Sequence, residues 1–117
     1  MSKNMEISFL LDFYGDMLTE KQRSMVDYYY NEDLSLAEIA ENEGITRQGV
    51  RDSIKRAEAQ LLEMEERLAL AARFRRLLTV QENARTLRAV NDRNGRIPEI
   101  EECAAKIAAA ADRMAEA

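Results

Sequence analysis

Polar and basic side chains that are able to read nucleic acid gather in residues 46–56 of this 117-residue chain. Arginine and glutamine make paired hydrogen bonds to the edges of guanine and adenine. A capping hydroxyl and the free amides of a first helical turn hold phosphate oxygens. The residues expected to contact nucleic acid are Arg47, Gln48, Arg51 and Lys55, with Thr46 and Arg56 on its phosphate backbone.

The composition offers little for catalysis or for metal binding. The chain has no histidine, which removes Ser–His and Cys–His catalysis and His-ligated zinc. Cys103 is the single cysteine and cannot close an intrachain disulfide, which is typical of a reducing cytosol. Because Cys103 adjoins two alanines, we expect it to be a small buried hydrophobe and not a nucleophile. We therefore predict no enzyme, no cofactor and no metal.

A helix-turn-helix is the element expected to position these contact residues. Ser35 with Glu38 forms a capping box that opens a short helix, and Gly44 suits the left-handed residue that ends it. Thr46 then caps a second helix, and Ala40 is the small residue where the two helices approach each other. Ile45, Val50 and Ile54 are expected to lock the helices together, and the apolar face of the second helix comprises Val50, Ile54, Ala57 and Leu61.

Helix signals extend over the remaining sequence, and no alternation typical of strands persists. A first helix over residues 9–18 is interrupted near Gly15, and Thr19 with Gln22 opens the next. Thr79 with Glu82 predicts a kink or restart within an otherwise continuous helix. Asn94-Gly95 predicts a stop, and Pro98 suits the first turn of a last helix. We predict an all-α chain, with a helix-turn-helix domain over residues 1–62, then a long helix and a C-terminal helical appendage over residues 63–117.

The three consecutive tyrosines, Tyr28 to Tyr30, allow two interpretations. They could form a platform on which bases stack, but consecutive residues point in different directions around a helix. We therefore expect them to be buried or half-buried core residues with hydroxyls at the surface. Phe9, Phe13 and Tyr14 are likewise expected to pack in the core.

The net charge of −5 is distributed unevenly along the chain. Residues 1–46 carry −7, residues 47–96 carry +5 and residues 97–117 carry −3. The total argues against nucleic-acid binding, but the positive block begins at the proposed contact residues. It therefore predicts weak non-specific binding with strong salt dependence. A second basic cluster either touches phosphate or pairs with Glu63, Glu65, Glu66 and Glu82; it comprises Arg73, Arg75, Arg76, Arg85 and Arg88.

A heptad spacing of apolar residues continues beyond the helix-turn-helix. Its members are Ile54, Ala57, Leu61, Met64, Leu68 and Ala71. The alternative to a two-stranded coiled coil is packing of one long helix on its own domain. We favour a homodimer because the seam outlasts any partner that the short N-terminal helices could supply. The expected dimer contacts are Leu61, Met64, Leu68 and Ala71.

Four segments together resemble the YlxM family of small bacterial proteins, over roughly the first two-thirds of the chain. They are DFYG (12–15), LTEKQ (18–22), DLSLAEIA (33–40) and GITRQGVRDSIKRAE (44–58). The resemblance implies a helix-turn-helix like that of region 4 of sigma-70 factors and a regulatory, nucleic-acid-binding function. Genes of this family tend to lie beside those of the signal recognition particle and its receptor. The resemblance therefore also implies a role in that pathway, through the particle's GTPase or its RNA.

Three hypotheses follow for a cytoplasmic protein with no membrane span. The preferred one is a dimeric regulator that binds DNA through the second helix of the helix-turn-helix. The alternative is an adaptor that binds the GTPase or the structured RNA of the signal recognition particle, with the helix-turn-helix as a structural unit. The third is a helical oligomerisation module without a nucleic-acid ligand.

Overall fold

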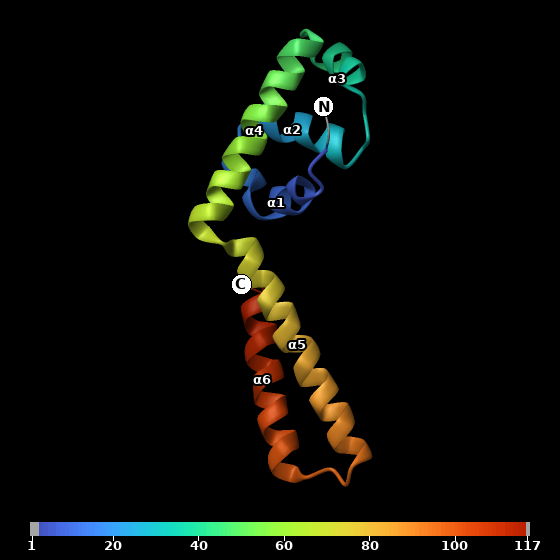
Figure 1. The fold of residues 1–117 in the computed structure, drawn as a ribbon, viewed down its shortest axis with the longest axis vertical. Coiled ribbons are helices and arrows are strands. Elements are labelled where there is room, and N and C mark those ends of the chain that lie inside the picture. Colours follow the sequence, from blue (N-terminus) through green and yellow to red (C-terminus); the bar gives the residue numbers. More distant parts are fainter. Residues whose placement is uncertain (1–2, 117) are drawn as a thin grey trace. The chain divides into compact units, whose positions relative to one another are not determined.

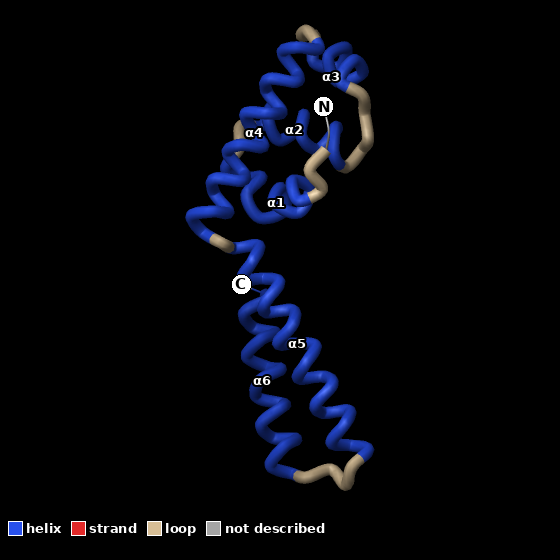
Figure 2. The backbone as a smooth tube through the Cα atoms, in the orientation of Figure 1, coloured by secondary structure: helices blue, strands red, loops and turns tan. Residues whose placement is uncertain are grey.

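The computed structural model describes residues 3–116 and confirms the all-α prediction (Figure 1, Figure 2). No strand occurs within this described part of the chain. The elements in order are α1 (Glu6–Tyr14), the 3₁₀ helix η1 (Gly15–Met17), α2 (Glu20–Tyr30), α3 (Leu36–Glu43), α4 (Arg47–Leu68), α5 (Leu70–Arg93) and α6 (Pro98–Glu116). No described helix is both long enough and apolar enough to cross a membrane.

The helix ends follow the predicted capping signals closely. The boxes predicted at Thr19 and Ser35 are formed: the Thr19 hydroxyl accepts from the Gln22 amide at 3.2 Å, and the Ser35 hydroxyl accepts from the Glu38 amide at 3.1 Å. In each box the side chain of the later residue accepts from the amide of the capping residue. The first helix gives way to η1 at Gly15, and α6 begins at Pro98, as the sequence predicted.

The chain forms two compact units, Met1–Ala71 and Ala72–Ala117. The sequence had placed this division after residue 62. The division comes later because the C-terminal half of α4 still packs on the first helices. Leu61 is buried in the core of the first unit, Met64 is half-buried against that core, and Ala71 is its last buried member.

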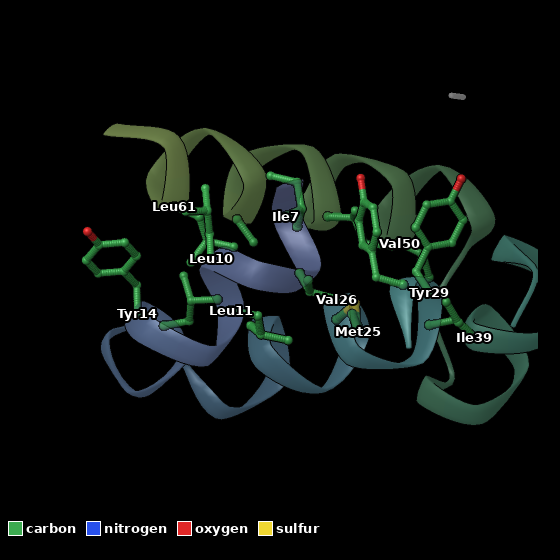
Figure 3. Close-up of a cluster of buried hydrophobic side chains, with 14 of the residues drawn as sticks. Ile7, Leu10, Leu11, Tyr14, Met25, Val26, Tyr29, Ile39, Val50 and Leu61 are labelled. Carbon is green, nitrogen blue, oxygen red and sulfur yellow. The ribbon is translucent and has the colours of Figure 1, made fainter. Parts of the chain in front are cut away.

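The core of the first unit lies where α4 packs against α1, α2 and α3 (Figure 3). Figure 3 shows Ile7 and Leu10 of α1, Val26 of α2 and Leu61 of α4 pointing into one apolar cluster. The predicted apolar face of α4, from Val50 to Leu61, is completely buried. Burial of such side chains contributes about 1.5–3 kcal/mol each, so this face accounts for much of the stability of the unit.

The aromatic residues are core residues, as predicted. Tyr29 and Tyr30 are buried and Tyr28 is half-buried, while Phe9 and Phe13 are half-buried against the same cluster. The Tyr30 hydroxyl donates to Glu58 Oε1 at 2.5 Å. A stacking platform would need exposed rings, and this packing leaves none of the three tyrosines exposed.

The predicted dimer seam lies largely within its own unit. Leu61 and Ala71 are completely buried, Met64 is half-buried, and Leu68 is 44% exposed. Most of the heptad spacing is therefore satisfied by packing on α1 and α2 of the same chain. Leu61 and Ala71 have no exposed surface to offer a second copy, and dimerisation itself stays a prediction.

The break in the long helical region falls at Ala69 and not at Thr79. Ala69 adopts the left-handed conformation (φ 54°), and α5 continues through Thr79, whose hydroxyl donates to the Arg75 carbonyl. The predicted restart at Thr79 is therefore wrong, because a threonine hydroxyl in a helix can bond to the preceding turn. Two side chains hold the backbone at the break. Tyr14 Oη, from α1, accepts from the Leu70 amide at 3.0 Å, and Glu65 Oε1, from α4, accepts from the Ala71 amide at 3.0 Å.

The second unit is a hairpin of α5 and α6, with its turn organised by Asn91. The Asn91 side chain donates to the Ile97 carbonyl at 2.9 Å and accepts from the Ile97 amide at 3.0 Å. Small residues let the helices approach, since Ala84, Ala104 and Ala111 are buried between them. Arg88 donates to Glu101 Oε1 at 2.7 Å and 3.1 Å across the hairpin.

Two predictions about side chains in the second unit need correction. Cys103 is exposed and not buried, because its neighbour Ala104 occupies the inward position of α6. In the second basic cluster, Arg85 pairs with Glu82 as one alternative predicted. Arg88 instead pairs with Glu101, a partner that the spacing along a single helix could not reveal.

Candidate nucleic-acid interface

The predicted helix-turn-helix is present as α3, a three-residue turn and α4. Gly44 ends α3 in the left-handed conformation (φ 68°), which a residue with a side chain adopts at a cost. The Gly44 and Ile45 amides both donate to the Ala40 carbonyl. Ala40 is buried at the approach of the helices, as expected.

One contact within the motif differs from the prediction. Val50 and Ile54 are completely buried and lock α4 in place, but Ile45 is 40% exposed. Its side chain lies over the start of α4 near Gly49 and leaves the turn open to solvent. The turn is therefore held by its backbone hydrogen bonds more than by apolar contact.

Thr46 caps α4 as predicted. Its hydroxyl accepts from the Gly49 amide at 2.9 Å, which satisfies one of the free amides of the first turn. Gly49 is suited to this position, because a Cβ there would lie 3.2 Å from the Thr46 hydroxyl oxygen. The remaining amides of the first turn point beyond the helix end, where they and the helix dipole favour an anion.

A groove of about 680 Å³ brings the predicted contact residues together with the start of α3. It is lined from α4 by Thr46, Arg47, Gln48 and Arg51, and from α3 by Ser35, Leu36 and Ala37. Two helix N-termini thus open onto one groove beside two arginines. The contribution of α3 was not predicted: the Ser35–Glu38 box marked a helix start, but only the tertiary packing brings that start beside α4.

The predicted contact residues do not all lie on one face of α4. At 100° per residue, Gln48, Arg51 and Lys55 fall on the side away from the buried Val50–Leu61 face. Arg56 falls about 140° from Arg51 around the helix, so it points to the other flank. The groove brings together Thr46, Arg47, Gln48 and Arg51. Lys55 lies outside the groove, on the same side of α4 as Gln48 and Arg51, and Arg56 lies away from Arg51.

The charges on this surface are mostly uncompensated. Across residues 3–116, no salt bridge involves Arg47, Arg51 or Lys55. Gln48 donates to Asp52 Oδ1 at 2.8 Å, so its amide is already oriented by a carboxylate one turn later. The surface therefore offers three cations and one oriented amide, with Asp52 as a negative charge among them.

The described residues hold no group of three or more cysteine, aspartate or glutamate side chains placed to bind a metal ion. The groove offers groups suited to recognition: arginine donors for phosphate or guanine, an amide for adenine, and free backbone amides for phosphate.

Comparison with known proteins agrees with the presence of a helix-turn-helix. A family profile, UPF0122, described as "Putative helix-turn-helix protein, YlxM / p13 like", matches residues 1–100. A UPF0122 protein of Desulforamulus reducens is 51% identical over 69 residues, which are 59% of this chain and 59% of that protein. One from Halalkalibacterium halodurans is 50% identical over 74 residues (63% and 68%). One from Acetivibrio thermocellus is 47% identical over 92 residues (79% and 74%).

Proposed function

We propose that this chain, which belongs to the YlxM / p13-like helix-turn-helix family, is a regulatory protein that binds duplex DNA through the start of α4. The observation that carries the proposal is the groove at which Arg47, Gln48 and Arg51 meet the N-terminus of α3. In such motifs the N-terminal residues of the second helix contact base edges while the first helix crosses the phosphate backbone.

The geometry supports a division of roles among the side chains. Gln48, Arg51 and Lys55 lie on the side of α4 opposite its buried face and would face the base edges and the adjoining DNA strand. Arg47, the Thr46 end of α4 and the Ser35 end of α3 would hold backbone phosphates. Arg56 contributes only if the duplex reaches the other flank of the helix.

The acidic charge on the rest of the chain weakens non-specific binding to DNA. Residues 1–46 carry −7, and Asp52 lies among the contact residues. A carboxylate there repels phosphate and accepts well only from a donor such as the amino group of cytosine. We therefore expect weak affinity for random duplexes and a large gain at a matching site.

The test measures binding at several salt concentrations in the Arg51→Ala/Lys55→Ala variant. With a mixed-sequence DNA duplex as probe, Arg51 and Lys55 would contact phosphates in place of matching bases. Each lost phosphate contact should then make the negative slope of log affinity against log salt shallower by about 0.9, so the double variant loses up to about 1.8 of its steepness. The matched control is Lys106→Ala/Arg113→Ala, which removes the same charge from α6. An unchanged affinity and slope in the first variant would refute the assignment of α4 as the DNA-contacting helix.

A second candidate function is an adaptor for the signal recognition particle, which binds its GTPase or its RNA. It is favoured by the acidity of the first helices, where Asp12, Glu20 and Glu41 are exposed and could face a basic protein surface. A pull-down from lysate with and without nuclease separates the candidates. Recovery of the particle protein without RNA supports the adaptor, and enrichment of one DNA sequence supports the regulator.

We further propose that the protein acts in the cytosol as a homodimer. A dimer would present two copies of α4 to two half-sites, which is the usual way in which helix-turn-helix proteins reach high affinity. Since Leu61 and Ala71 are buried within one chain, the contact between copies must use another surface.

A further inference from the structure

One face of the α5–α6 hairpin carries apolar side chains that no other part of the hairpin covers. A groove of about 410 Å³ on this face is lined by both helices. Val80 of α5 is 44% exposed there, and Ile107 and Met114 of α6 are 44% and 66% exposed. The remaining lining residues are Arg73, Arg76, Leu77, Ala110 and Ala111.

The exposed residues follow helical spacing, so they form one continuous face. On α6, Cys103, Ile107, Ala110 and Met114 recur at steps of four, three and four. On α5, Val80 and Leu87 are seven residues apart, and both are exposed. Residues with this spacing stay within a narrow arc of a helix of 3.6 residues per turn. We call this set the outer face of the hairpin.

The outer face lies beside the seam that holds the hairpin together, and Ala111 borders both. Ala84, Ala104 and Ala111 are buried between the helices, and Gln81 donates to Asp112 across them at 2.8 Å. The hairpin thus has one apolar seam buried between its helices and a second, exposed apolar stripe beside it. A helix pair that is apolar on two sides is typical of a unit within a larger bundle.

Charge at the two ends of the outer face indicates which occupant it suits. Arg73 and Arg76 flank the end where α5 begins, and Glu99 flanks the end near the hairpin turn. Within the described residues, none of these three takes part in a salt bridge. An antiparallel second copy brings each arginine pair to the end of the partner face that carries Glu99, whereas a parallel copy sets arginines against arginines.

The size of the outer face is also suited to a second copy. A helix of 19 residues is about 28 Å long, and two neighbours together are about 20 Å wide. Each copy would therefore cover on the order of 600 Å², and the pair about 1,200 Å², which exceeds the roughly 1,000 Å² expected of a specific interface.

From these observations we propose that the protein dimerises by packing the outer faces of two α5–α6 hairpins against each other, antiparallel, as a four-helix bundle. The two-fold axis passes near Asn83 and Ile107, which lie at the middle of α5 and of α6. Asn83 of the two copies then meet across the axis, where a paired amide fixes the register of an apolar seam. This inference rests on the proposed homodimer and supplies its surface.

The first test compares three lysine variants of the full-length chain by sedimentation equilibrium. Val80→Lys places a charge on the outer face, and Leu78→Lys is its matched control. Leu78 is 45% exposed against 44% for Val80, but it lies about 160° away around the same helix. Val80→Lys and Ile107→Lys should each weaken dimerisation by about tenfold or more, because a buried unpaired ammonium is costly. Leu78→Lys should dimerise like the wild type, and circular dichroism should show equal helicity in all variants.

The second test reads the orientation from disulfide formation in a Cys103→Ser background. Asn83→Cys should form a covalent dimer on mild oxidation, because antiparallel packing brings the two residues together at the axis. Arg85→Cys, on the opposite face of α5, should form no covalent dimer under the same conditions.

The outcomes separate the inference from the proposals on which it rests. A wild-type chain that is monomeric at high concentration overturns both the dimer and its surface, while DNA binding is tested independently. A dimer that survives both Val80→Lys and Ile107→Lys overturns the hairpin surface and leaves the homodimer standing. A covalent dimer from Arg85→Cys but not from Asn83→Cys refutes the packing of the outer faces.

Discussion

The Tyr14 hydroxyl joins α1 to the break between α4 and α5, and its removal gives a quantitative test of how that break is held. Tyr14 is completely buried, donates to Glu65 Oε1 at 2.6 Å and accepts from the Leu70 amide at 3.0 Å. Tyr14→Phe removes one oxygen and leaves the ring in place. The variant therefore isolates these two hydrogen bonds from the packing of the ring.

The expected loss of stability follows from the chemistry of the two hydrogen-bond partners. A hydrogen bond to a charged group contributes about 1.5–3 kcal/mol and one to a neutral amide about 0.5–1.5 kcal/mol. Glu65 is half-buried and Leu70 is exposed, so water can reach both partners and replace some of what is lost. We expect Tyr14→Phe to lower the free energy of unfolding of the first unit by about 2 kcal/mol, which corresponds to about 8–16 °C in Tm for a domain of this size.

The assay is urea unfolding of the full chain followed by circular dichroism, with amide exchange at Leu70 and Ala71 as a local readout. Tyr28→Phe is the matched control, because the Tyr28 hydroxyl has no hydrogen-bond partner among residues 3–116. The control should change stability by less than about 0.5 kcal/mol. If Tyr14→Phe is no less stable than Tyr28→Phe, and exchange at Leu70 is unchanged, the reasoning about this junction is refuted.

Three further predictions concern the turn and two sets of titrating groups. Gly44→Ala should destabilise the first unit by about 1 kcal/mol in urea unfolding, because of the left-handed backbone alone, and Gly44→Asn should cost less. Burial first, and then hydrogen bonds to carboxylates, raise the pKa of Tyr14 and Tyr30 above the ordinary value. The stability that these phenols contribute is complete below about pH 10 and is lost as pH rises, so alkaline destabilisation should be smaller in Tyr30→Phe than in wild type. The hydrogen bond from Arg88 lowers the pKa of Glu101, so this pair favours the fold at neutral pH and loses its effect as pH falls; in an NMR titration, Arg88→Met should raise the Glu101 midpoint.

Local signals in the sequence were sufficient wherever the deciding contacts are short-range. The Thr19 and Ser35 capping boxes, the left-handed Gly44 and the Thr46 cap each involve residues within four positions of one another. The buried face of α4 follows from helical periodicity, which depends only on backbone geometry. These features together define the helix-turn-helix and most of its contact residues.

Features that depend on contacts between distant residues were not predicted. The break at Ala69 relies on Tyr14, more than fifty positions earlier, and its sequence carries no glycine or proline to announce it. Thr79 with Glu82 matches a capping box, but no tertiary contact ends the helix there, so α5 runs through it. Cys103 is exposed because α6 turns Ala104, and not Cys103, toward α5.

The sequence by itself therefore determined the all-α class, the helix-turn-helix and the basic start of its second helix, since helix caps and periodicity are encoded locally. Only the tertiary structure decided which apolar stripe is buried within the chain and which stays exposed. It placed the stripe of Leu61 and Ala71 inside one chain, set the N-terminus of α3 beside Arg47 and Arg51, and left the outer face of the hairpin uncovered. The physical reason is that an apolar stripe specifies burial but not its partner, and the partner is fixed only when the helices pack.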